Sequence, residues 1–221
     1  MENKNGLTPA FFCVPDITGF TRFIATADIS FTKEVIPALL RKLIEANILK
    51  MKIGEIEGDA IFFYKTGRLP SVNTVALQCK LLYKTFCDFL QVLEQNDSEN
   101  YNKYLSDNQL GLKVIIHYGE ISSARIKGHT KLLGQDVIIA HKLLKNSVNE
   151  LNYILLSDKY LSKITNKKKL KFWFNWEELH TGKETYDYIG DVGYHYITLD
   201  EMEYMEDIPF VSLLKINKKA T

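Results

Sequence analysis

The order of apolar segments constrains the fold of this chain more than any other feature of its sequence. Strand-like runs alternate with two long segments whose apolar residues recur at helical spacing. Residues 10–14 predict a buried strand, residues 51–64 a hairpin, and residues 110–128 two strands joined by a turn near Gly119. This order predicts a ferredoxin-like β-α-β-β-α-β pattern in an α/β (α+β) fold, with helices packed on a mainly antiparallel sheet.

Three helices are expected between these strands. The first is short and follows Gly19, the second runs from a cap at Thr32 to about Leu49, and the third spans about 72–93. Pro37 would cost the second helix a hydrogen bond unless its first turn is irregular.

Beyond these elements, residues 132–147 are expected to begin as a loop and become a helix, and residues 153–157 to form a short strand. The polar run at 94–108 is expected to be a surface loop. The side chains of residues 170–176 show the two-residue alternation that is typical of a half-buried strand. Residues 185–199 predict a closing hairpin.

Composition favours one domain without nucleic-acid or membrane partners. The 221 residues are 46% hydrophobic, which predicts a single domain over 1–221, with a core at about 10–199 and a C-terminal tail at 200–221. The formal net charge of +1 gives no nucleic-acid footprint. The polar start lacks a signal peptide, no run is long enough to cross a bilayer, and the three cysteines show no CxxC spacing. A cytoplasmic protein is expected.

Two carboxylates occupy positions suited to a metal. Asp16 follows the first strand and Asp59 lies in the predicted hairpin turn, so both would project at one edge of a ferredoxin-like sheet. Such carboxylates suit Mg²⁺ or Mn²⁺, and the Gly19 turn with the helix after it offers N–H groups to an anion. An acidic residue there is also typical of a cap or turn, so both interpretations stay open. His117 is expected to pack or hydrogen-bond within its strand.

Four segments, in order, resemble the motifs of class III nucleotidyl cyclases and cover about residues 10–147. Residues 11–24 resemble the first metal motif, and residues 54–64 the hairpin that carries Gly-Asp. Residues 112–128 look like the family's Ile-His-x-Gly strand pair, and residues 132–147 like its glycine loop and helix. The segments "EGDAIFFY" and "AHKLLKN" resemble the corresponding segments of a group of bacterial cyclase-like proteins labelled DUF2652. The resemblance implies the nucleotidyl cyclase form of the predicted sandwich.

The resemblance also implies a homodimer that binds a nucleoside triphosphate and two Mg or Mn ions at its interface. Asp16, Asp59 and the backbone carbonyl of Ile17 match the metal ligands. The backbone of residues 19–21, which are Gly19, Phe20 and Thr21, would meet the triphosphate. In this family the metal activates the ribose 3′-hydroxyl and draws charge from the leaving pyrophosphate.

The other half of the family's site departs from its pattern. Glu55 matches a base-selecting position and is the residue type of guanylate cyclases, whereas Lys131 at the second such position fits neither class. One alternative is that Lys131 pairs with Glu55 across the dimer and blocks guanine recognition. Ile138 replaces the asparagine that stabilises the transition state and cannot donate a hydrogen bond. Lys142 replaces the phosphate-binding arginine, keeping the charge without the bidentate fork.

These departures leave three functional hypotheses. Losing one preorganised donor typically lowers the rate by about 10²–10³, so metal and nucleotide binding with poor cyclase turnover is the leading hypothesis. A catalytically inactive cyclase-fold module in dimerisation or regulation is the alternative from a different class. The third is a cyclase of unusual base specificity, in which Asn146 or His141 replaces the missing donor.

Overall fold

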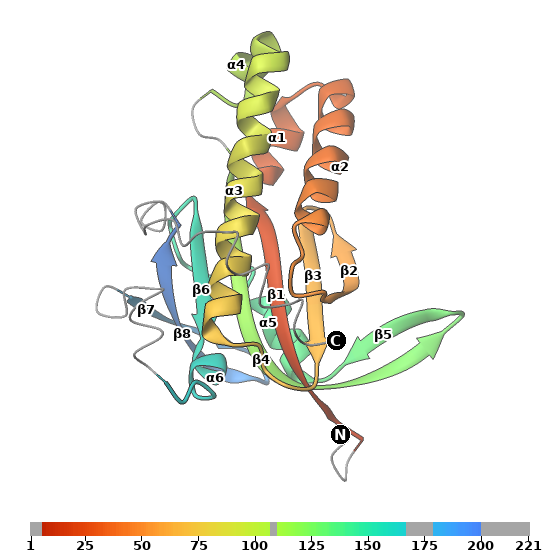
Figure 1. The fold of residues 1–221 in the computed structure, drawn as a ribbon, viewed down its shortest axis with the longest axis vertical. Coiled ribbons are helices and arrows are strands. Elements are labelled where there is room, and N and C mark those ends of the chain that lie inside the picture. Colours follow the sequence, from red (N-terminus) through yellow and green to blue (C-terminus); the bar gives the residue numbers. More distant parts are fainter. Residues whose placement is uncertain (1–5, 107–109, 167–178, 200–221) are drawn as a thin grey trace, which may run out of the picture.

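One sheet organises the protein (Figure 1). The computed structural model describes residues 6–106, 110–166 and 179–199. Its strands are β1 Thr8–Thr18, β2 Lys52–Glu57, β3 Ala60–Thr66, β4 Gly111–Ile126, β5 His129–Leu133, β6 Tyr153–Ser157, β7 His180–Tyr186 and β8 Gly190–Thr198. Their order in the sheet is β2-β3-β1-β4-β6-β8-β7, and β5 pairs with β4 outside this path. The β4–β6 pair is parallel and the other pairs described are antiparallel, as expected.

Helices cover both faces of the sheet. They are α1 Phe20–Thr26, α2 Ile29–Glu45, α3 Val72–Asn96, α4 Ser98–Tyr104, α5 Gln135–Lys142 and α6 Asp158–Leu161. Figure 1 shows α2 and α3 running alongside each other past one end of the sheet, while the β4–β5 hairpin projects as an arm. Within the described residues, no helix is long and apolar enough to cross a membrane.

Strand β1 is buried on both faces because successive side chains point to opposite sides. Phe11 and Cys13 pack in the cluster that includes α2 and α3, whereas Phe12 and Val14 pack in the cluster that includes α5. The predicted sandwich of helices on an antiparallel sheet is therefore confirmed, with β1 between β3 and β4.

The second helix begins earlier than expected. Helix α2 starts at Ile29 after Asp28 and ends at Glu45, so the predicted cap at Thr32 is wrong. Thr32 is buried inside the helix. The helix starts earlier because Phe31 extends the apolar stripe by one turn toward the N-terminus. Pro37 consequently lies in the interior of α2 rather than in an irregular first turn.

The predicted loop at 94–108 is largely helical. Helix α3 continues to Asn96, and α4 follows with Asp97 accepting a hydrogen bond from the Asn100 N–H at 3.3 Å. Tyr104 of α4 is buried, with its ring centre 5.7 Å from that of Phe31. The polar composition of this segment belongs to the exposed face of a short helix.

The predicted turn at Gly119 is also wrong. Strand β4 passes through Gly119, and the hairpin to β5 turns at Lys127 and Gly128, where φ is 47° and 86°. Gly119 is required by a close approach instead, because a Cβ there would lie 2.0 Å from Cγ of Asp136. The closing hairpin is confirmed as β7 and β8. The predicted strand at 170–176 and the tail at 200–221 lie outside the described residues.

Candidate functional site

Asp16 and Asp59 meet beside the C-terminal end of β1. Strands β1 and β3 are neighbours, and Asp59 lies in the turn between β2 and β3. The backbone N–H of Ile17 donates a hydrogen bond to Oδ2 of Asp59 at 3.1 Å. Burial, the charge of Asp16 and a hydrogen bond between the two side chains raise the pKa of Asp59 to about 7. Asp59 therefore keeps its proton up to about neutral pH, because burial and the neighbouring Asp16 disfavour a second negative charge.

Lys113 completes this group and was not predicted from the sequence. It lies opposite Asp16 in the β1–β4 register, with Nζ 2.8 Å from Oδ2 of Asp16. The same ammonium donates a hydrogen bond to the carbonyl of Leu144 at 2.8 Å. The side chains of Lys113 and Asp16 are 15% and 13% exposed, so the pair is largely removed from water. A single lysine within the apolar run "LGLKVII" was the available signal.

The turn after β1 places backbone N–H groups next to these carboxylates. Gly19 has φ of 81° and precedes α1, and no side chain caps this helix. The first N–H groups of a helix have no partner within it, which leaves those at Phe20 and Thr21 available to an anion. The hydroxyl of Thr18 is buried and finds no hydrogen-bond partner in the described part of the chain.

A second group forms around Glu55 on β2. His141 Nε2 lies 2.9 Å from Oε1 of Glu55, and Lys131 Nζ lies 3.4 Å from Oε2. The His141 ring stacks on Phe62, with the ring centres 4.3 Å apart and the planes at 9°. Lys131 reaches Glu55 within one chain, because β5 lies beside β2.

The remaining predicted residues lie on or just after α5. Ile138 is 51% exposed, and Lys142 is exposed with Nζ 5.8 Å from the centre of the Tyr186 ring. Asn146 is engaged structurally, because its Nδ2 donates to the Leu143 carbonyl and to the Tyr153 hydroxyl. Of the two substitutes for the missing donor, His141 therefore remains beside the predicted base position.

The predicted residues thus fall into two groups. One contains Asp16, Asp59 and Gly19, and the other contains Glu55 and Lys131. No ion pair among the described residues joins the two groups.

The first group has the chemistry of a site for a hard cation. Two carboxylates and the Ile17 carbonyl are oxygen ligands of the kind that Mg²⁺ and Mn²⁺ prefer. Across the ranges that the structure describes, no group of three or more His, Cys, Asp or Glu side chains is arranged so that it could hold a metal ion. Further ligands for an ion at Asp16 and Asp59 would therefore be backbone, water or substrate oxygens.

Solved structures identify the class of fold. The guanylyl cyclase Cya2 is 14% identical, with a TM-score of 0.60, covering 92% of this chain and 95% of that one. The adenylyl cyclase CyaB from P. aeruginosa is 12% identical with a TM-score of 0.53 (86% and 94% covered). The guanylate cyclase domain of RhGC from Catenaria anguillulae, in complex with GTP, is 15% identical with a TM-score of 0.53 (86% and 96% covered). The chain therefore has the fold of a class III nucleotidyl cyclase catalytic domain.

Sequence comparison then identifies the family. The model described as "Protein of unknown function (DUF2652)" matches residues 36–153, more than half of the chain, and the chain belongs to this family. A relative in Mycobacterium tuberculosis, the uncharacterized protein Rv2561/Rv2562, is 29% identical over 123 residues. That match covers 54% of this chain and 56% of the relative, so the chain spans about half the length of the relative.

Proposed function

We propose that this protein is a divergent class III nucleotidyl cyclase-like protein that binds a divalent metal and a nucleoside triphosphate at a homodimer interface. The observation that carries this proposal is the meeting of Asp16 and Asp59 beside the left-handed turn at Gly19. Acidic pairs next to free backbone N–H groups suit a metal-bound triphosphate, because the cation and the phosphates are recognised side by side.

The electrostatics of the acidic pair support a cation. Lys113 offsets one carboxylate, yet the pKa of Asp59 is still raised to about 7 by burial and by Asp16. A divalent ion would stabilise the ionised form of both carboxylates. When bound, such an ion supplies Lewis-acid activation of a hydroxyl and charge stabilisation on the phosphates. The chain itself supplies the ligands Asp16, Asp59 and the Ile17 carbonyl, and the N–H groups that orient the phosphates.

The residues that depart from the family's pattern favour weak or absent cyclase turnover. Ile138 has no donor to stabilise a transition state, and a missing preorganised donor lowers rates by about 10²–10³. Lys142 provides a charge without bidentate geometry. Glu55 is already bound by His141 and Lys131, so a base would have to displace one of them.

The alternative is an inactive cyclase-fold module that acts in dimerisation or regulation. The contacts of Glu55 support it, because Lys131 and His141 of the same chain already bind this carboxylate and the His141 ring is stacked on Phe62. This alternative predicts a stable dimer whose stability does not depend on metal or nucleotide.

Thermal unfolding with and without Mn²⁺, against each of the four ribonucleoside triphosphates, tests the proposal. We expect a stabilisation that requires both Mn²⁺ and one triphosphate, of about 3 kcal/mol near a hundredfold excess over the dissociation constant. Asp16→Asn should abolish this stabilisation, because it removes a charged ligand while keeping the shape of the side chain.

A matched variant controls for the loss of charge. Asp88→Asn removes a carboxylate that pairs with Lys84 on the surface of α3, far along the chain from the proposed site, and should leave the stabilisation unchanged. If a triphosphate binds, mass spectrometry of the reaction mixture measures the turnover. Absence of any metal-dependent stabilisation would instead favour the inactive module.

A further inference from the structure

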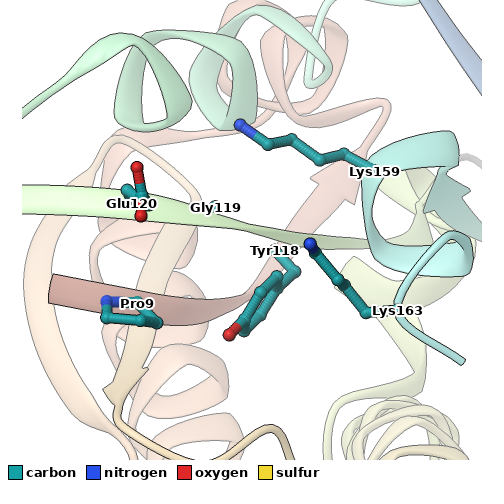
Figure 2. A pocket seen from close by; sticks show the side chains of 6 residues that line it. All are labelled: Pro9, Tyr118, Gly119, Glu120, Lys159 and Lys163. Carbon is teal, nitrogen blue, oxygen red and sulfur yellow. The ribbon is translucent and has the colours of Figure 1, made fainter. Parts of the chain in front are cut away.

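A cavity lies at the opposite end of β1 from Asp16. It has a volume of about 370 Å³, which is in the range of small-molecule sites. Its lining residues are Pro9, Tyr118, Gly119, Glu120, Lys159 and Lys163 (Figure 2). Asp16 lies seven residues beyond Pro9 on β1, which separates them by roughly 23 Å at the rise of an extended strand. The cavity is therefore distinct from the proposed metal site.

Lys159 is held in place at this cavity by a buried acid. Its Nζ lies 2.6 and 2.7 Å from the two carboxylate oxygens of Asp136. The Lys159 side chain is 48% exposed, whereas that of Asp136 is 7% exposed. Asp136 also accepts hydrogen bonds from the Glu120 N–H at 2.8 Å and from His117 at 3.1 Å. Asp136 thus holds the end of the lysine, while about half of the Lys159 side chain stays exposed where it lines the cavity.

Lys163 adds a charge that this network does not neutralise. It lies two residues after the end of α6, is exposed, and makes no ion pair with any residue that the structure describes. Figure 2 shows Lys163 pointing toward Tyr118, Lys159 extending across β4 above Gly119, and Glu120 further along β4 beyond Gly119. The cavity is therefore lined by two lysine side chains from α6 and the residues just after it, and by one carboxylate from β4.

We propose that this cavity binds a small hydroxylated phosphate ester. Its phosphate would contact the ammonium groups of Lys159 and Lys163, because a doubly charged oxyanion complements two nearby cations. A hydroxyl group of the ligand would donate to Glu120. The site is independent of the proposed nucleotide site and of any metal.

Titration of the isotopically labelled protein by NMR, with EDTA present, tests this site. The probes are glycerol 3-phosphate, inorganic phosphate and glycerol. We expect saturable shifts of the backbone signals at 118–120 and 159–163 with both phosphates, tighter binding of glycerol 3-phosphate, and no response to glycerol. Shifts confined to 16–21, or shifts that do not saturate, would overturn the proposal.

Two variants make the test specific. Lys163→Gln should weaken binding of glycerol 3-phosphate about tenfold, as expected for the loss of one charged hydrogen bond. Lys33→Gln removes an equal charge from the exposed side of α2 and should bind like the unaltered protein. Asp16→Asn should also bind normally, which separates this site from the proposed nucleotide site. Equal binding by Lys163→Gln and Lys33→Gln would show that the cavity is not the site.

Discussion

Asp136 shows at the scale of one residue how this fold keeps a buried acid charged. Burial alone would raise its pKa, but hydrogen bonds from His117, Lys159 and the Glu120 N–H outweigh burial and lower the pKa to about 2. Burial lowers the pKa of His117, so the neutral ring donates from Nε2 to Asp136 and accepts at Nδ1 from Ser157. The expectation that His117 packs and hydrogen-bonds is confirmed.

Replacing Asp136 should therefore give a loss of stability that depends on pH. We expect Asp136→Asn to lower the free energy of unfolding by about 1–3 kcal/mol at pH 7, because Lys159 and His117 lose a charged partner. The pKa of Asp136 is lower in the folded state than its ordinary value of 3.8. Its contribution is therefore present above about pH 4 and is lost as the pH falls through about 2. Urea unfolding at pH 7 and pH 2.5 measures both.

The control for this prediction is an exposed acid. Asp88→Asn breaks a surface pair with Lys84 and should change the free energy of unfolding by about 0.3–0.5 kcal/mol. A deficit of Asp136→Asn that is the same at both pH values would contradict the role given to its charge.

Single residues also show how far the sequence could predict the site. Asp16 and Asp59 could be predicted, because residues next to them in the sequence indicate the strand, the turn and the hairpin in which they lie. Lys113 could not, because its contact with Asp16 depends on the register between β1 and β4. Asp136 resembles an ordinary residue in the first turn of a helix, and its burial depends on the absence of a side chain at Gly119.

At the scale of elements, Pro37 makes α2 weaker than its apolar stripe suggests. Pro37 is the ninth residue of α2 and is exposed, so its ring adds little packing and its missing N–H removes a hydrogen bond. We expect Pro37→Ala to raise the free energy of unfolding by about 1–3 kcal/mol. Urea unfolding at neutral pH measures the change.

A proline outside a helix provides the comparison. Pro70 lies directly before Ser71, the N-cap of α3, and should have the opposite effect when replaced. Pro70→Ala should lower the free energy of unfolding by about 0.4–1 kcal/mol, because the unfolded chain gains freedom. If Pro37→Ala were also destabilising, the ring of Pro37 would have to contribute contacts that outweigh the hydrogen bond.

The elements that sequence patterns missed share a physical cause. Helix α4 has seven residues, of which Tyr104 is buried, so its periodicity is too short to distinguish from a polar loop. Strand β4 contains Gly119, which marks a close approach of Asp136 rather than a turn. In both cases tertiary contacts decide the structure, whereas the long stripe of α3 and the hairpin of β2 and β3 are determined locally.

At the scale of the whole molecule, the edge of the sheet at β2 and the elements next to it carry several exposed apolar residues. Ile53 and Ile56 of β2, Leu133 of β5 and Ile138 of α5 are each between 42% and 51% exposed. These elements meet at the edge of the sheet, because β2 contacts β5 and Glu55 of β2 contacts His141 of α5. Ile53 and Ile56 pair with Phe63 and Ile61, so they lie on the opposite face of β2 from Glu55 and α5. Neighbouring exposed apolar residues are typical of protein–protein interfaces, so this region supports the proposed homodimer.

A charged residue in this region should therefore weaken self-association. Sedimentation equilibrium over a range of concentrations should show a dimer for the unaltered protein. Ile56→Asp should raise its dissociation constant at least tenfold, because burying an isoleucine contributes about 1.5–3 kcal/mol and a symmetric interface would contain the substitution twice. Ile29→Asp is the matched control, because Ile29 is 79% exposed at the start of α2. Equal association of the two variants would place any dimer on another face, and a monomer at all concentrations would contradict the homodimer itself.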